Sequence, residues 1–244
     1  MNLLAEYALS ALAVLLILTI HEYAHAYAAY RLGDNTARNL GRLSLNPLKH
    51  LDPLGAICMV LFHFGWAKPV PINPRSFRKP KRDFAITALA GPLSNMIFAF
   101  FSAFLYLLLV SLFSRMEIKS EFAYQLILNL CRFVAIFHQI NIGIGLFNLI
   151  PIPPLDGSRI LNVVLPPKYY FGIMKYERQI YFGLIAWLAF GDMIKRAALS
   201  VPIVAASPVL STIAGIFSLS DMLGYVIIWL SDAMISFWQL IPFL

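Results

Sequence analysis

The sequence predicts an all-α polytopic membrane protein, and two properties of the chain support this prediction. The 244 residues are 60% hydrophobic and only 13% charged, with a mean hydropathy of +0.74, whereas soluble domains carry about 25% charged residues. Several apolar runs also reach the roughly 20 residues that a helix needs to cross a bilayer. We therefore expect one integral membrane domain over residues 1–244, in contact with lipid along most of its length.

Five to six helices are expected to cross the membrane. The predicted spans are residues 3–30, 84–114 and 122–150, with two or three further helices within 180–194 and 199–241. Residues 54–66 are apolar but too few to cross, which predicts a re-entrant segment. The prolines of residues 67–82 argue against a helix and favour an extended chain. The organisation expected is a catalytic core over about residues 1–165, followed by C-terminal helices over about 180–244.

The basic residues indicate an orientation. The net charge is +7, and Lys and Arg gather in residues 31–82 and 159–178, between apolar runs. This distribution is typical of cytoplasmic loops and of contact with anionic lipid rather than nucleic acid. It places the N-terminus outside. The compact chain suggests a prokaryotic cytoplasmic membrane. Cys58 and Cys131 lie inside apolar stretches and predict no disulfide.

One motif with recognisable chemistry lies inside the first predicted span. Residues 21–25 read His-Glu-Tyr-Ala-His, which places His21 and His25 one helical turn apart on the same face. Two imidazoles at this spacing can hold one zinc ion, and Glu22 between them can act as general base toward a water molecule. Because ionisable side chains are costly in a bilayer, three of them together indicate a functional site rather than a chance match.

A catalytic zinc site commonly uses three protein ligands, so a third ligand is expected at a similar depth. Asp156 is the best candidate, because it follows the span 122–150 at a break made by three prolines. Irregular backbone at membrane depth is tolerated only where protein or a wet cavity surrounds it, and a metal site would account for the break. The alternative role for Asp156 is the N-cap of a short helix that begins near Ser158.

The two motifs together resemble the site-2 proteases, a family of intramembrane zinc metalloproteases. That family combines H-E-x-x-H in one transmembrane helix with L-D-G near the end of a later one, here Leu155-Asp156-Gly157. The resemblance extends to Asn148, eight residues before the aspartate, and to the run Gly91-Pro92-Leu93-Ser94-Asn95. It covers about residues 10–165, whereas residues 180–244 carry no matching motif.

The resemblance implies a role for each residue of the site. It implies one zinc ion per chain held by His21, His25 and Asp156, with Glu22 activating the water molecule. Asn148 matches the family position that holds the substrate or the developing oxyanion, to which a side-chain amide can donate. The alternative role for Asn148 is an ordinary interhelical hydrogen bond.

Two further segments have counterparts in the family. The connection between its first two helices resembles a membrane-embedded sheet whose edge can hold an extended substrate by strand addition. The corresponding residues here are Lys68, Pro69, Val70, Pro71, Ile72 and Asn73. The prolines remove donors from this edge, and a plain cytoplasmic loop is the alternative. Gly91 and Asn95 are four residues apart, a small-x-x-x-small pattern for which we expect a packing role.

The predicted function is hydrolysis of peptide bonds in or near transmembrane segments of membrane proteins. The alternatives are an intramembrane metal-ion carrier and a catalytically silent scaffold. Glu22 argues against a carrier, which needs no general base between its ligands. Oligomeric state and substrate identity cannot be read from the sequence.

The remaining histidines are predicted to be structural. His50 and Asp52 are expected to form a structural pair rather than a second metal site, because their separation fits no usual ligand pair. His63 and His138 are isolated and are expected to make hydrogen bonds in the interior or at the interface.

Overall fold

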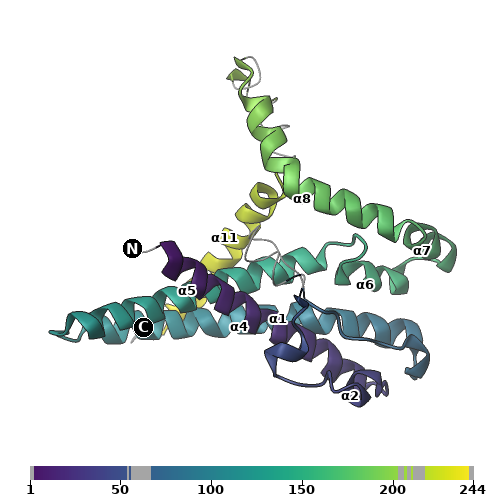
Figure 1. Cartoon of the computed structure of the whole chain (residues 1–244), viewed down its shortest axis with the longest axis horizontal. Coiled ribbons are helices and arrows are strands. Elements are labelled where there is room, and N and C mark those ends of the chain that lie inside the picture. Colours follow the sequence, from purple (N-terminus) through teal and green to yellow (C-terminus); the bar gives the residue numbers. More distant parts are fainter. Residues whose placement is uncertain are drawn as a thin grey trace.

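The computed structural model describes residues 3–53, 55, 67–202, 206, 207, 210 and 218–241, and this part of the chain is almost entirely helical (Figure 1). The elements in chain order are α1 (Leu3–Arg31), α2 (Thr36–Asn39), the 3₁₀ turns η1 (Pro47–Lys49) and η2 (Pro74–Ser76), α4 (Pro80–Ser114), α5 (Glu121–Leu149), α6 (Asp156–Val164), α7 (Pro167–Met174), α8 (Glu177–Leu199) and α11 (Leu219–Trp238). The described residues include no β-strand, only one isolated antiparallel bridge between Leu51 and Ala67. The all-α prediction is confirmed.

Four helices of the described chain are long and apolar enough to cross a membrane. They are Leu4–Arg31, Pro80–Ser114, Glu121–Leu149 and Asp221–Trp238, within α1, α4, α5 and α11. The first three coincide with the three spans predicted over the N-terminal two thirds of the chain. The C-terminal part contains α8 as well, which is not among the four, so the count of five to six spans stays a prediction. The predicted re-entrant segment 54–66 lies almost wholly outside the described residues.

The extended chain predicted over residues 67–82 is wrong at two places. Residues 74–76 form the turn η2, and α4 already begins at Pro80. Proline is compatible with a first helical turn, because its missing N–H would have no intrahelical partner there. The Asp83 carboxylate stabilises this start by accepting the Lys79 N–H at 2.9 Å. Only residues 67–73 and 77–79 remain non-helical.

The chain reverses sharply between α5 and α6, and Gly157 allows this reversal. A Cβ atom on Gly157 would lie only 2.3 Å from the Leu149 carbonyl oxygen and 2.6 Å from that of Ile150. Only glycine therefore lets the start of α6 lie against the end of α5. Asp156 is the first residue of α6, and Leu155 is the N-cap, so the alternative role of Asp156 as the cap of a later helix is not observed.

Helices α1, α4 and α5 form the centre of the molecule through small side chains. Several alanines are at most 1% exposed at these contacts: Ala13, Ala29, Ala99 and Ala103. Gly145 on α5 faces Met96 on α4 so closely that a Cβ atom would lie 2.3 Å from the Met96 Cε. Large apolar side chains point outward instead, such as Phe101 (57% exposed) and Leu126 (61% exposed), which suits contact with lipid.

Candidate metal centre

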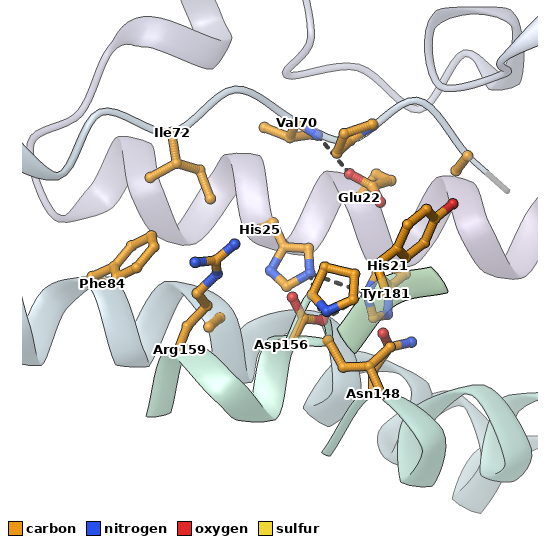
Figure 2. A pocket seen from close by; sticks show the side chains of 15 residues that line it. His21, Glu22, His25, Val70, Ile72, Phe84, Asn148, Asp156, Arg159 and Tyr181 are labelled. Atoms are coloured by element: carbon orange, nitrogen blue, oxygen red, sulfur yellow. Dashed lines mark hydrogen bonds and ion pairs between the residues drawn. The ribbon is translucent and has the colours of Figure 1, made fainter. Parts of the chain in front are cut away.

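The predicted ligands converge on one point between α1 and α6. His21 and His25 are buried on α1, and their Nε2 atoms lie 3.0 Å apart. Each Nε2 lies 3.1 Å from the Oδ2 atom of Asp156. Figure 2 shows the two imidazoles facing Asp156, whereas Glu22 points to the opposite side of the cleft. Among the described residues, these three are the one group of His, Cys, Asp and Glu able to hold a metal ion.

The chemistry of these three atoms suits a cation between them. The His25 Nδ1 atom is 2.7 Å from the Thr87 carbonyl oxygen, which can only accept, so Nδ1 carries a proton and the lone pair of the neutral ring lies on Nε2. That lone pair faces the second imidazole and a carboxylate oxygen. Tetrahedral zinc bonds of about 2.0–2.1 Å need ligand atoms roughly 3.3 Å apart, close to the separations observed. The residues therefore fit zinc.

Asp156 is suited to remain an anion at this position. Burial alone would raise the pKa of its carboxyl, but the electrostatic interaction with the adjacent imidazoles of His25 and His21 holds the pKa below its usual range. Whether the neighbouring cation is a proton or a metal ion, the carboxylate stays ionised and available as a ligand.

Gly91 brings α4 against the two imidazoles. A Cβ atom at this position would lie 2.4 Å from the Nε2 of His25 and 2.7 Å from the Cε1 of His21. Any other residue would therefore displace at least one ring. The packing role predicted for Gly91 is confirmed, and its partners are the two metal-binding rings.

The three ligands open into a cleft of about 590 Å³. Its lining combines His21, Glu22, His25 and Asp156 with Val70 and Ile72 on one side and Asn148, Phe84, Arg159 and Tyr181 on the other. The cleft is open to the exterior and has both polar and apolar walls. A segment of polypeptide can therefore reach the metal-binding atoms from outside.

Glu22 lines the same cleft and is held by the main chain of a neighbouring segment. Its Oε2 atom accepts the Val70 N–H at 2.8 Å, and Val70 itself is buried. This contact fixes a carboxylate next to the metal ligands without using it as a ligand. The predicted general-base role of Glu22 needs a carboxylate in this place.

The predicted substrate-binding residues form an extended strap (residues 68–73) across the cleft. Most of its N–H groups are already used: the Lys68 N–H donates to the His50 carbonyl at 2.8 Å, and the Asn73 N–H donates to the Asp34 carboxylate at 2.7 Å. With the Val70 N–H on Glu22, the N–H of Ile72 is the one in the strap that no described group accepts. The strap belongs to no sheet in the described chain.

Asn148 lies on the wall of the cleft next to His21 and Asp156 (Figure 2). Its Nδ2 atom donates to the Ile144 carbonyl of its own helix at 3.0 Å. The alternative role as an interhelical hydrogen bond is therefore not observed. Because an amide nitrogen carries two protons, this bond leaves one N–H of Asn148 over.

The other histidines have the structural roles expected, with one correction. His138 is buried and contacts the Ala99 carbonyl at 2.8 Å and the Ser231 hydroxyl at 2.9 Å. His50 is also buried, but its Nε2 donates to the Ser44 carbonyl at 2.7 Å. The predicted pairing of His50 with Asp52 is wrong: Asp52 accepts the Gly55 N–H instead. His63 and Cys58 lie outside the described residues.

Several functional positions were not found by sequence reasoning. Thr87 fixes the tautomer of His25 through its carbonyl, a role that any residue type could fill and that leaves no signal in the sequence. Asp34 and Arg42 anchor the strap, Arg42 by donating to the Lys68 carbonyl. Their only sequence signal is that they are charged residues close to a span, where burial needs a partner.

Comparison with known proteins agrees with this site. The profile of Peptidase family M50 matches residues 9–169. The chain is 44% identical over 170 residues to the candidate zinc metalloprotease YwhC of Bacillus subtilis (strain 168), covering 70% of this chain and 74% of that protein. It is also 28% identical over 158 residues to Rip2 of Mycolicibacterium smegmatis, another candidate zinc metalloprotease, covering 63% of this chain and 56% of Rip2.

A third relative is archaeal. The zinc metalloprotease MJ0392 of Methanocaldococcus jannaschii is 29% identical over 150 residues, covering 62% of this chain and 32% of that protein. No solved structure matches the chain.

The chain belongs to peptidase family M50, the site-2 protease family. This confirms the resemblance, and with it the predicted enzyme class: a membrane-embedded zinc metallopeptidase whose cofactor is Zn²⁺ and whose substrate is a protein. The metal-carrier and scaffold alternatives are not favoured.

Proposed function

We propose that this protein hydrolyses peptide bonds within or next to the transmembrane segments of other membrane proteins. One observation carries the proposal: three metal-ligand atoms within 3.1 Å of one another open, with a separate carboxylate, into a cleft. Two of the ligands and the carboxylate lie on α1, a helix long and apolar enough to cross a bilayer. A substrate that reaches this cleft from the membrane is itself a membrane segment.

The chain's own residues divide the catalytic work. His21, His25 and Asp156 would hold zinc, which supplies Lewis-acid polarisation and lowers the pKa of water. Glu22 takes the proton of the attacking water and returns it to the leaving amine. The free N–H of Asn148 is placed to donate to the oxyanion that develops on the scissile carbonyl. Every role uses an atom that faces the cleft.

The strap has a double role in this proposal. Its Val70 N–H orients the Glu22 carboxylate. The substrate backbone pairs with the remaining backbone groups of the strap, which are the Ile72 N–H and the proline carbonyls. The substrate must be extended to pair in this way, because a helix uses its carbonyls in its own hydrogen bonds. Helix-destabilising Gly or Pro near the cleavage point should therefore speed hydrolysis, since they lower the cost of unwinding.

We also propose an orientation and a location. The basic segments 31–82 and 159–178 face the cytoplasm, which leaves the N-terminus outside in a prokaryotic inner membrane. His21 follows Leu3 by about 27 Å of helix rise, so the metal lies toward the cytoplasmic side and water reaches it from there. Residues 1–244 act as one integral membrane domain with a catalytic core over about 1–165.

A reconstituted proteolysis assay tests the function. The full chain is placed in vesicles with a transmembrane substrate that carries a tag on each side, and cleavage is followed with and without a zinc chelator. We expect cleavage near the cytoplasmic side, its loss with chelator and its return with added zinc. Chelator-insensitive cleavage, or cleavage only of soluble peptides, would contradict the proposal.

A further inference from the structure

The two metal-binding imidazoles differ in what holds them. A histidine that binds a metal through one ring nitrogen almost always donates its other N–H to a fixed partner, which sets the tautomer and the ring orientation. His25 has such a partner in the Thr87 carbonyl, 2.7 Å from its Nδ1. The Nδ1 of His21 is buried and has no hydrogen-bond partner among the described residues.

The direction of the unpaired His21 nitrogen follows from its contacts with α4. A Cβ atom on Gly91 would lie 2.7 Å from the Cε1 of His21, and Cε1 lies between the two ring nitrogens. Because Nε2 is directed at His25 and Asp156, Nδ1 lies on the other side of Cε1, away from His25. Along α4, Thr87 contacts His25 and Gly91 contacts both rings. The next turn of this face, at Asn95, therefore lies at the His21 end.

Asn95 has unpaired polar atoms of its own. It is 0% exposed, and neither its Oδ1 nor its Nδ2 has a hydrogen-bond partner among the described residues. Helix α5 closes the other side, since a Cβ atom on Gly145 would lie 3.3 Å from the Asn95 Cβ. A buried amide without partners is costly.

We propose that Asn95 is a positioning residue for His21: one buried water molecule accepts the Nδ1 proton of His21 and donates to the carboxamide oxygen of Asn95. This bond would fix Nε2 of His21 as the metal-binding nitrogen, as Thr87 does for His25. The inference rests on the proposed zinc site and adds to the packing role expected for Asn95.

Zinc affinity of the purified full-length protein, measured by competition with a chromogenic chelator, tests this role. Asn95→Leu keeps the size of the side chain and removes the acceptor, and we expect zinc affinity to fall by about ten- to a hundredfold. Asn95→Asp keeps an oxygen acceptor, and we expect it to bind zinc at least as tightly as the wild type. The matched control is Asn141→Leu, which removes a buried amide from α5 whose Nδ2 donates to the Phe137 carbonyl. We expect it to lower thermal stability and leave zinc affinity within about twofold.

A spectroscopic readout separates positioning from packing. In the cobalt-substituted protein, Asn95→Leu should shift the visible absorption bands, which report ligand geometry, whereas Asn141→Leu should not. Unchanged zinc affinity in Asn95→Leu, equal weakening in Asn141→Leu, or tenfold weakening in Asn95→Asp would each overturn the role of Asn95. Failure of the wild type to bind zinc would instead overturn the proposed metal site itself.

Discussion

The catalytic part of the molecule and its C-terminal part are packed very differently. Around the metal centre, Gly91 and Gly157 lie where a Cβ atom would come within 2.4 Å of its neighbours. In the C-terminal helices, Gly183 and Gly224 have nothing within 4 Å, and Figure 1 shows α8 extending away from the other helices. Of these glycines, those without room for a Cβ atom thus lie in the region that holds the candidate ligands. That region falls within the residues that the family profile matches.

Specific contacts join the C-terminal helices to one another and to the rest of the molecule. Asp221 on α11 pairs with Lys195 on α8. The Trp238 indole N–H donates to the Phe100 carbonyl of α4 at 2.9 Å. None of these residues lines the metal-binding cleft. The account therefore predicts that zinc binding and hydrolysis respond to changes around α1, α4 and α6. They should tolerate changes in α8 and α11 that lie away from Tyr181 and from the cluster that Leu184 and Leu223 form with Leu155.

Removal of a ligand should give the largest effect. We expect Asp156→Ala to lose more than about a hundredfold in zinc affinity, and all measurable hydrolysis, because only two of three ligands remain. Asp221→Ala removes a carboxylate from the C-terminal part and should retain zinc. Metal content after dialysis, measured by mass spectrometry, compares the two; similar content in both variants would remove Asp156 from the site.

Glu22→Gln should separate metal binding from chemistry. The amide keeps the size of the side chain but cannot take a proton, so we expect hydrolysis to fall by about a hundred- to ten-thousandfold with zinc content unchanged. Single-turnover cleavage and metal analysis on the same preparation check both halves. Loss of zinc in this variant would show that Glu22 is a ligand.

Gly91→Ala compares the two regions through one methyl group. The new Cβ would meet both imidazoles, and overpacking of this kind costs about 1–3 kcal/mol, so we expect zinc affinity to fall by about ten- to a hundredfold. Gly224→Ala has open space and should leave affinity unchanged while slightly favouring its helix. Equal zinc affinity in the two variants would mean that α4 does not press on the ligands.

Val70→Pro should give the smallest change of the series. It removes the N–H that orients Glu22, and we expect cleavage to slow by about tenfold, the equivalent of one net hydrogen bond, with zinc retained. Val70→Ala keeps the donor and serves as control. If Val70→Pro cleaves at the rate of Val70→Ala, the strap does not position the base.

Local patterns were enough to predict the first three apolar helices and the three side chains that converge in the cleft. Uninterrupted apolar runs define residues 84–114 and 122–150, and the spacing of His21 and His25 determines their common face on any helix. Asp156 was found from a break in a span that a buried site would explain. In each case the signal lies within about one helix of the residue concerned.

The features that escaped prediction depend on how separate helices meet. Thr87 acts through a backbone carbonyl, and the Val70 N–H reaches Glu22 only because the strap crosses α1; neither contact is encoded in a short stretch of sequence. The tolerance of α4 for Pro80 in its first turn was missed for a different reason. The density of prolines in residues 67–82 argues against a helix throughout, whereas proline is disfavoured only beyond the first turn.

X-ray absorption at the zinc edge of the purified full-length protein tests the central claim most directly, because it reports the atoms bound to the metal without any assay of activity. The account predicts one zinc per chain bound by two imidazole nitrogens and by oxygen, at about 2.0–2.1 Å, with no sulfur, and the loss of one imidazole contribution in His25→Ala. A spectrum with fewer than two imidazoles in the wild type, or with a sulfur ligand from a cysteine, would contradict it.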